Sequence, residues 1–220
     1  MFPVPTPDIP ANVIEELGAI VGPENLVAGR DELLAYECDA FTLEKQRPGA
    51  VVLPRSTEEV AAVVRVCARE NLPMIPRGAG TSLSGAVLAV AGGVQIALTR
   101  MTRVLEVDVR NRRALVQAGC VNAWITNAVR AHGLYYAPDP SSQMACTIGG
   151  NVGTNSGGPH TLKYGVTTNH ILGFEMVLAD GSVEWFGTSP GQGEDLGGLD
   201  LRGAAIGSEG MFGKIGRAHV

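Results

Sequence analysis

The sequence predicts a fold that mixes helices and strands, and three observations support this prediction. First, an apolar strand at residues 50–54, a helix behind it and a second strand at 74–75 form a β-α-β unit. Second, a glycine-rich segment directly follows the second strand, at the sheet edge where open α/β sheets bind ligands. Third, further strands and an Asp-Gly turn extend to residue 186.

Apolar spacing and end signals predict the helices. They cover residues 10–21, 30–37, 56–70, 121–132 and 199–205. Ser56 followed by Glu59 predicts a capping box at the start of the third helix. Gly133 suits the position just after the end of the fourth. The third helix would face the core with Val60, Val63, Val64 and Cys67.

Short apolar runs predict the strands, at residues 50–54, 74–75, 94–98, 104–109, 113–117, 171–178 and 183–186. Asp180-Gly181 predicts a type I′ turn that joins the last two strands into a hairpin. Residues 135–170 have no periodicity and predict a long loop, which in a compact domain is expected only where it has a function. A second loop, rich in glycine, is expected at 189–198.

Composition narrows the class of protein. The chain has 220 residues, 45% of them hydrophobic and 18% charged, which suits one or two folded domains and excludes a disordered chain. Its net charge of −5 without a basic cluster argues against nucleic-acid binding. The N-terminus lacks a secretory signal, and no apolar run is long enough for a membrane span. Four scattered cysteines suit a reducing cytosol, are expected as small buried side chains, and predict no metal site.

The first glycine block, residues 76–85, reads PRGAGTSLSG. Glycines and hydroxyls in such density predict a nest of backbone N–H groups for a phosphate or pyrophosphate, with a plain surface turn as the alternative. The phosphate loop of nucleotide triphosphatases would need a lysine where Ala86 stands. The dinucleotide fingerprint would need a third glycine where Leu83 stands. Neither ATP nor NAD therefore fits.

The second glycine block, residues 147–158, reads TIGGNVGTNSGG and follows a PDPSS segment at 138–142. It has almost nothing to bury against itself, so its backbone is expected to pack against another group. A flat ligand that carries a diphosphate would satisfy both blocks, and hydrogen bonds to a charged group contribute about 1.5–3 kcal/mol each. The alternative is a glycine-rich Ω-loop packed on itself.

Together the two blocks resemble the FAD-linked oxidases of the vanillyl-alcohol-oxidase type. Residues 163–165 (KYG) and 207–210 (GSEG) continue the resemblance in the same order. The resemblance covers roughly residues 47–213 and is strongest to the branch that contains the FAD-binding D subunit of bacterial glycolate oxidase. It implies an α+β fold, the two-subdomain FAD-binding fold of the p-cresol-methylhydroxylase type. A small β-α-β subdomain and a larger mixed-sheet subdomain would hold FAD between them, which is not a Rossmann fold.

The resemblance also implies which residues contact FAD. The first block would cradle the pyrophosphate, and the remaining residues would line the flavin, the ribityl chain and the phosphates. The implied set is Arg77, Gly78, Ala79, Gly80, Thr81, Ser82, Gly85, Pro138, Asp139, Pro140, Ser141, Thr147, Gly149, Gly150, Asn151, Thr154, Asn155, Ser156, Gly157 and Gly158. Some relatives attach FAD through a histidine in the first block. None stands between Arg77 and Gly85, so we expect non-covalent FAD.

The activity implied is oxidation of a 2-hydroxy acid, with hydride transfer from the substrate carbon to the flavin. Glycolate is expected first, with D-lactate and D-2-hydroxyglutarate as alternatives. In the family the catalytic base lies in a C-terminal cap domain, so we expect no catalytic residue in this chain. His160 and His170 are expected to make ordinary polar contacts. Two alternatives are a flavin-binding module without its own turnover and a reductase of the cell-wall UDP-sugar type that uses NADPH.

The resemblance further implies partner subunits, an iron–sulfur protein and a second flavin-type subunit, and a cytoplasmic location in which such partners would hold the protein at the inner face of the cell membrane. We expect a helical segment at 1–46, the FAD-binding domain at 47–213 and a non-native tail at 214–220. Residues 215–220 (IGRAHV) match one reading frame of a common sequencing adapter. On this hypothesis the chain is a truncated fragment without its cap domain.

Overall fold

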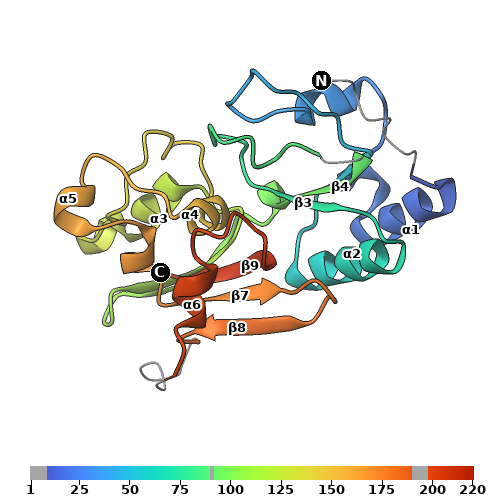
Figure 1. The fold of residues 1–220 in the computed structure, drawn as a ribbon. Coiled ribbons are helices and arrows are strands. Elements are labelled where there is room, and N and C mark those ends of the chain that lie inside the picture. The colour runs from blue at the N-terminus through green and yellow to red at the C-terminus, as the bar shows by residue number, and fades with distance from the viewer. Residues whose placement is uncertain (1–8, 90–91, 190–197) are drawn as a thin grey trace.

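The computed structural model describes residues 9–89, 92–189 and 198–220. Two sheets form the framework (Figure 1). A large apolar core packs against both sheets, and a smaller cluster contains Leu33, Val51, Leu53 and Ala97. The first sheet has the strand order β1-β2-β4-β3 and the second has the order β5-β6-β9-β7-β8. This mixture of helices with two separate sheets is the predicted α+β arrangement.

The first sheet contains β1 (Leu26–Val27), β2 (Ala50–Val52), β3 (Met74–Arg77) and β4 (Val94–Ala97). β2 and β3 both pair with β4 in parallel, while β1 pairs with β2 in the antiparallel direction. The predicted β-α-β unit is therefore wider than expected, because β4 lies between the two strands that α2 connects. Strand β1 belongs to the segment predicted as helical, so part of residues 1–46 contributes to this sheet.

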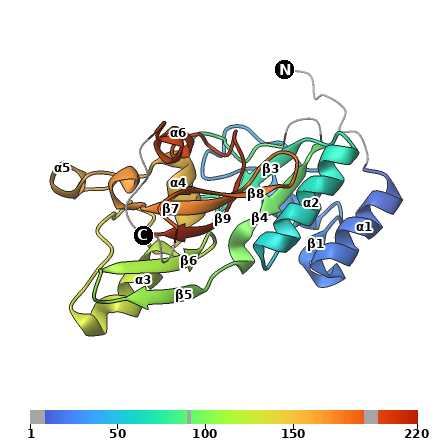
Figure 2. The ribbon, with the colours of Figure 1, turned by 90° about the horizontal axis from the view of Figure 1, so that it is seen from below.

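Helices α1 (Ala11–Val21) and α2 (Thr57–Arg69) pack together beside the first sheet (Figure 2). Ser56 Oγ accepts a hydrogen bond from the Glu59 N–H at 3.3 Å, as the capping prediction requires. Glu59 completes the box one residue earlier than expected, because its carboxylate accepts from the N–H of Arg55. The buried face of α2 also contacts β7 and β9, so this helix joins the two sheets.

The second sheet contains β5 (Val104–Asp108), β6 (Arg113–Gln117), β7 (Gly173–Val177), β8 (Val183–Gly187) and β9 (Lys214–His219), with every pairing antiparallel. The hairpin of β7 and β8 was predicted, but the type I′ turn predicted for it was wrong. Only Gly181 has a positive φ, of 80°, whereas a type I′ turn needs two such residues. The turn is a three-residue loop closed by the Leu178 N–H to Ser182 O bond.

The predicted long loop at 135–170 contains regular structure. It includes α4 (Ile148–Thr154), α5 (Thr161–Tyr164) and the 3-10 turn η6 (Thr167–His170). The helix was missed because glycine has low helix propensity, whereas here two apolar side chains, Ile148 and Val152, are fully buried on one face of α4. Tertiary packing thus overrides local preference.

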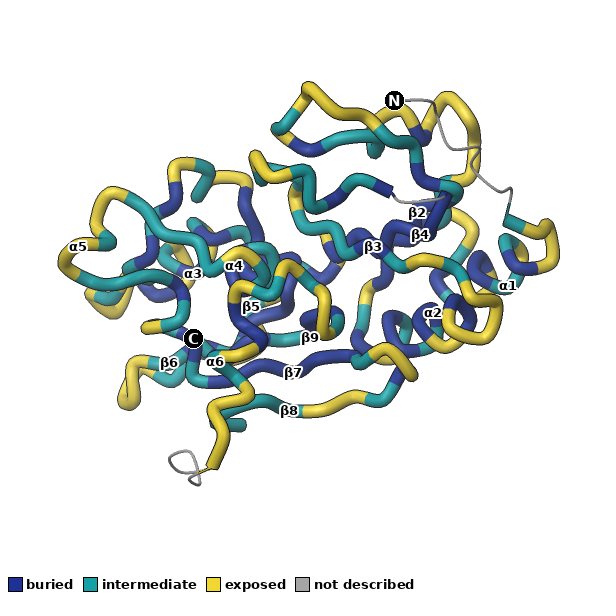
Figure 3. The backbone as a smooth tube through the Cα atoms, viewed as in Figure 1, coloured by how far each residue is buried: buried dark blue, intermediate teal, exposed yellow. Residues whose placement is uncertain are grey.

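The remaining elements are α3 (Asn122–Val129), α6 (Leu201–Ala205), and the 3-10 turns η1 (Pro23–Asn25), η2 (Glu32–Tyr36), η4 (Leu98–Arg100) and η5 (Arg130–His132). The helix predicted at 30–37 is thus a 3-10 turn. Most of the glycine-rich loop predicted at 189–198 lies outside the described residues. Figure 3 shows that buried segments concentrate in β2, β4, β7, β9 and α2. The edge strands β5 and β8 contain no buried residue.

Residues of the expected tail form β9, the middle strand of the second sheet, between β6 and β7. This strand buries two titratable side chains, since Lys214 and His219 are each less than 10% exposed. Burial lowers the pKa of Lys214 to about 8. A central strand is therefore present at 214–219, and the non-native origin of its residues stays a prediction.

Candidate functional site

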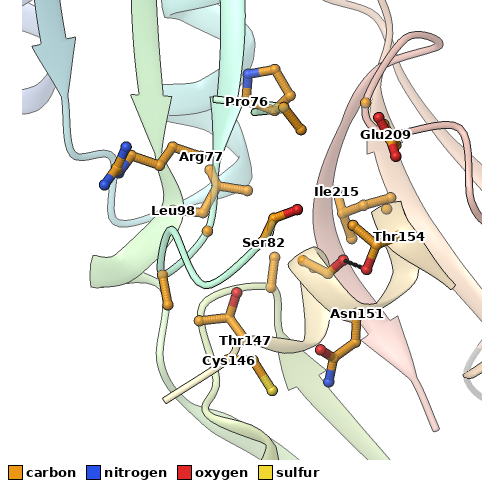
Figure 4. Close-up of a pocket in the computed structure, with 18 of the residues that line it drawn as sticks. Pro76, Arg77, Ser82, Leu98, Cys146, Thr147, Asn151, Thr154, Glu209 and Ile215 are labelled. Carbon is orange, nitrogen blue, oxygen red and sulfur yellow. Dashed lines mark hydrogen bonds between the residues drawn. The ribbon is translucent and has the colours of Figure 1, made fainter. Parts of the chain in front are cut away.

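A cavity of about 200 Å³ lies between the two sheets, where the two glycine blocks face each other (Figure 4). The end of β3 and the first block form one wall, α4 forms the second, and a loop at 208–213 forms the third. Apolar side chains complete the cavity: Leu98, Met176 and Ile215 among them. Of the predicted residues, the cavity is lined by Arg77, Gly78, Ala79, Gly80, Thr81, Ser82, Thr147, Gly149, Gly150, Asn151, Thr154 and Ser156.

The first wall offers backbone donors. The N–H groups of residues 78–82 donate to no other group within the described parts of the chain. Thr81 and Ser82 add hydroxyl groups. Such a run of free N–H groups is what a phosphate nest without lysine requires, and its binding of a phosphate stays a prediction.

Arg77 lines this wall with its backbone, but its side chain turns away from the cavity (Figure 4). The guanidinium Nη1 donates to the Cys38 carbonyl at 3.1 Å, and the group lies 5.3 Å from the centre of the Tyr36 ring. Burial lowers the pKa of Arg77. Its guanidinium therefore holds another segment of the chain and is not directed at the cavity.

The second wall is formed by α4. Thr147 occupies the N-cap position of this helix, yet its side chain makes no capping hydrogen bond. Its Oγ1 is fully buried without a partner in the described structure, although the residue lines the cavity. A buried hydroxyl without a partner costs about 1–3 kcal/mol, so a hydrogen bond to a bound group would stabilise this atom.

Glycine is required at two close contacts: one joins the first glycine block to Thr147, and the other joins α4 to the residue after β6. A Cβ on Gly78 would lie 2.7 Å from Thr147 Oγ1, and a Cβ on Gly149 would lie 2.9 Å from the Cβ of Ala118. The absence of side chains therefore lets the first block approach Thr147 and lets α4 pack on the end of β6. Gly153 faces open space, because nothing lies within 4 Å of its Cβ position.

The third wall, the loop at 208–213, was absent from the predicted set. Ser208, Glu209, Gly210 and Gly213 line the cavity. The N–H groups of Gly207 and Glu209 donate to the carbonyls of Val152 and Gly153 at the end of α4. The GSEG sequence at 207–210 could have predicted this wall, since these residues were already part of the family resemblance.

Eight predicted residues lie outside the cavity lining: Gly85, Pro138, Asp139, Pro140, Ser141, Asn155, Gly157 and Gly158. Most of them support the walls from behind. Gly158 packs on the backbone of Asp139, where a Cβ would lie 2.1 Å from the carbonyl oxygen. Asn155 accepts hydrogen bonds from the N–H and hydroxyl of Thr168. Their direct contact with a cofactor stays a prediction that this geometry does not favour.

Asn151 lines the cavity, but its amide is used elsewhere. Its Nδ2 donates to Asn122 Oδ1 at 2.9 Å, and Asn122 Nδ2 donates to the Pro138 carbonyl at 2.9 Å. Both side chains are almost fully buried. This pair of amides fixes the segment at 138–142 against α4, which brings Ser142 rather than Ser141 to the cavity.

Neither predicted histidine lines the cavity. His160 Nδ1 lies 2.5 Å from a carboxylate oxygen of Asp139, and His170 Nε2 lies 2.9 Å from the Tyr164 carbonyl. These are the polar contacts that were expected. Cys146 does line the cavity and was missed; burial raises its pKa, so it stays a neutral thiol.

The residues present fit FAD. The free N–H groups of the first block suit a pyrophosphate, the Thr147 hydroxyl lacks a partner, and apolar side chains suit a ring system. Arg77 is the only basic residue among those that line the described cavity, and its charge lies behind the loop. Backbone dipoles would therefore carry most of the anion recognition.

Comparisons with known proteins agree with this fit. A sequence family described as "FAD binding domain" matches residues 48–187. The chain is 45% identical over 183 residues to the glycolate oxidase subunit GlcD of Escherichia coli K12, covering 83% of the chain and 36% of that protein. It is 39% identical over 196 residues to a D-lactate dehydrogenase of Anaerostipes hadrus, covering 89% of the chain and 41% of that protein.

A solved structure of alkyldihydroxyacetonephosphate synthase matches with a TM-score of 0.85 at 27% identity, over 98% of the chain and 41% of that protein. The chain thus spans well under half the length of these relatives. In the described part of the chain, no helix has the length and apolar character needed to cross a bilayer.

Proposed function

Because the chain belongs to the FAD-binding-domain family, with FAD as its cofactor, we propose that it forms the flavin-binding part of a 2-hydroxy-acid dehydrogenase. The relatives named for glycolate and D-lactate support this substrate class. When bound, FAD accepts two electrons from the substrate. The residues of this chain hold the cofactor, orient it and exclude water from it.

The observation that carries the proposal is the buried Thr147 hydroxyl. It lies at the meeting point of the two glycine blocks, 3% of the residue is exposed, and no group of the described chain accepts or donates a hydrogen bond there. We propose that it bonds to FAD, and that the N–H groups of residues 78–82 bind the pyrophosphate.

Thr147→Val tests this proposal because valine keeps the shape and removes the hydroxyl. Without cofactor, the variant is expected to be more stable by about 1 kcal/mol, since a buried unsatisfied group is lost. With FAD, its dissociation constant should rise about tenfold, since 1.4 kcal/mol corresponds to that factor. Thermal unfolding and fluorescence titration with FAD would measure the two effects. Unchanged FAD affinity together with lower stability would contradict the proposed role.

We propose glycolate as the first substrate, with D-lactate and D-2-hydroxyglutarate as alternatives. Steady-state assays of the full gene product against these three acids with an artificial dye acceptor would distinguish them. Reduction of the bound flavin by NADPH rather than by any hydroxy acid would favour a reductase of the UDP-sugar type. Flavin binding without reduction by any of these compounds would favour a module that has no turnover of its own.

We also propose that electrons pass to partner subunits, because the relative in Escherichia coli is named as a subunit. An iron–sulfur protein and a second flavin-type subunit are the partners expected, in the cytoplasm or at the inner face of the membrane. The catalytic base is proposed to lie outside residues 1–220, since His160 and His170 are bonded away from the cavity. Co-purification of the gene product with its neighbours would test the assembly.

A further inference from the structure

Residues 36–41, which we call the strap, pass behind the first glycine block. They begin at the last residue of the 3-10 turn η2 and precede the sequence that the family comparison matches, which begins at residue 48. Hydrogen bonds connect the strap to the start of the glycine block, to its end and to the strand beside it. These three connections arise from residues far apart in the sequence.

The start of the glycine block is held through Arg77. Its guanidinium Nη1 donates to the Cys38 carbonyl at 3.1 Å and lies against the Tyr36 ring, 5.3 Å from the ring centre. The glycine block folds over this side chain. A Cβ on Gly80 would lie 2.6 Å from Arg77 Nη2, so the missing side chain at this position, where φ is 70°, gives the guanidinium its space.

The end of the glycine block is held through Asp39. This carboxylate is 6% exposed, and both of its oxygens accept hydrogen bonds from backbone N–H groups. Oδ1 accepts from Phe41 at 2.8 Å within the strap, and Oδ2 accepts from Gly85 at 3.1 Å. Gly85 has a φ of 74°, so the chain turns at the residue that Asp39 holds.

A third connection fixes the strap to the first sheet. Gln95 in β4 is fully buried, and its Nε2 donates to the Tyr36 carbonyl at 2.9 Å and to the Val87 carbonyl at 2.7 Å. One amide therefore joins the strap to Val87, two residues after the glycine block. Between the two held ends of the block, the N–H groups of residues 78–82 donate to no group within the described chain.

We propose that Asp39 is a positioning residue for the cofactor, acting with Arg77 through the strap. Together they fix both ends of residues 77–85, so that the N–H groups between them already converge before the pyrophosphate binds. Ordering a glycine-rich loop only on binding would lower the affinity, which is the cost that preorganisation removes. The proposal rests on FAD as the ligand of the cavity.

Asp39→Asn tests this inference, with Glu37→Gln as the matched control. An asparagine side chain has one acceptor oxygen and one NH2 donor. It can accept from only one of the two backbone N–H groups, so the bond to Gly85 or to Phe41 is lost. We expect FAD to bind about tenfold more weakly to Asp39→Asn. Glu37→Gln removes the same charge two residues away, from an exposed pair with Lys45, and should bind FAD as the wild type does.

Amide hydrogen exchange of the FAD-free protein supplies a readout that is independent of the cofactor. In the wild type the amides of Gly85 and Phe41 should exchange more slowly than those of Gly78 and Gly80, and one of the two should lose this protection in Asp39→Asn. Arg77→Lys should also accelerate exchange across residues 78–85, because an ammonium group cannot stack on Tyr36 as a planar guanidinium does.

Equal exchange of Gly85, Gly78 and Gly80 in the wild type would overturn the inference, even if Asp39→Asn failed to fold. Unchanged FAD affinity in a folded Asp39→Asn variant would also overturn it. Failure of the wild type to bind FAD would instead contradict the proposed function. These outcomes are separate, since the exchange measurement needs no cofactor.

Discussion

The two glycine blocks meet at one cavity, but they reach their positions by different means. The second block, at 147–158, includes α4, whose Ile148 and Val152 side chains are buried in the core. The first block, at 76–85, has no helix, and its ends are held by the strap. A glycine-rich segment can thus be fixed either by its own few apolar residues or by polar groups from elsewhere in the chain.

The largest expected loss of stability comes from a substitution that disrupts the packing of the second glycine block. Gly149→Val places its Cβ within 2.9 Å of the Ala118 side chain and 3.1 Å of its carbonyl oxygen, with two more methyl groups beyond. We expect α4 to shift and the free energy of unfolding to fall by about 3 kcal/mol, the upper range for overpacking. Urea unfolding would measure this loss. A loss below about 0.5 kcal/mol would show that α4 is held less rigidly than its contacts indicate.

The second-largest effect is expected at alkaline pH, which should weaken the second glycine block. Burial raises the pKa of the Cys120 thiol to about 11, and the Cys120 carbonyl accepts the N–H that begins α4. The folded protein keeps this proton between pH 9 and about 11 while the unfolded chain loses it, so stability falls as pH rises through this window. The thiol contributes about 2 kcal/mol to this fall.

Cys120→Ala isolates that contribution. The variant should be less stable than the wild type at pH 8, because a buried side chain becomes smaller. The difference between the two proteins should shrink towards pH 11, since only the wild type has a thiol to ionise. Unfolding curves across this range would measure the change, and parallel pH profiles would contradict the prediction.

The smallest effect is expected at Gly153, on the same helix as Gly149. Nothing lies within 4 Å of its Cβ position, so Gly153→Ala should fit and stabilise the FAD-free protein by about 0.5 kcal/mol through helix propensity. Its added methyl group enters the cavity, so FAD should bind more weakly. Higher stability with unchanged FAD affinity would show that the cofactor does not approach this part of α4.

Much of the fold was predictable, for reasons that are visible in particular elements. The face of α2 follows from the spacing of Val60, Val63, Val64 and Cys67, all of them buried. Strands β2 to β8 follow from short apolar runs, whereas β1 and β9 were not predicted. The position of β4 between β2 and β3 was not predictable, because local periodicity contains no information on which strands pair.

Many residues of the candidate site were predictable, but the directions of their side chains and hydrogen bonds were not. The sequence pointed to both glycine blocks, and twelve of the twenty predicted residues line the cavity. It did not show that the Arg77 side chain would turn towards the strap, or that Gly85 would donate to Asp39. Both details depend on residues 36–41, which are distant in the chain and were assigned to a separate segment.

The sequence by itself determined most of the helices and strands of this protein and the two glycine blocks that face its cavity, because apolar spacing and glycine content act locally. Tertiary structure alone decided the order of the strands, the helical state of the second block and the direction of the Arg77 side chain. These features depend on contacts between segments far apart in the chain, where burial outweighs local preference and each polar group takes the partner that folding brings to it.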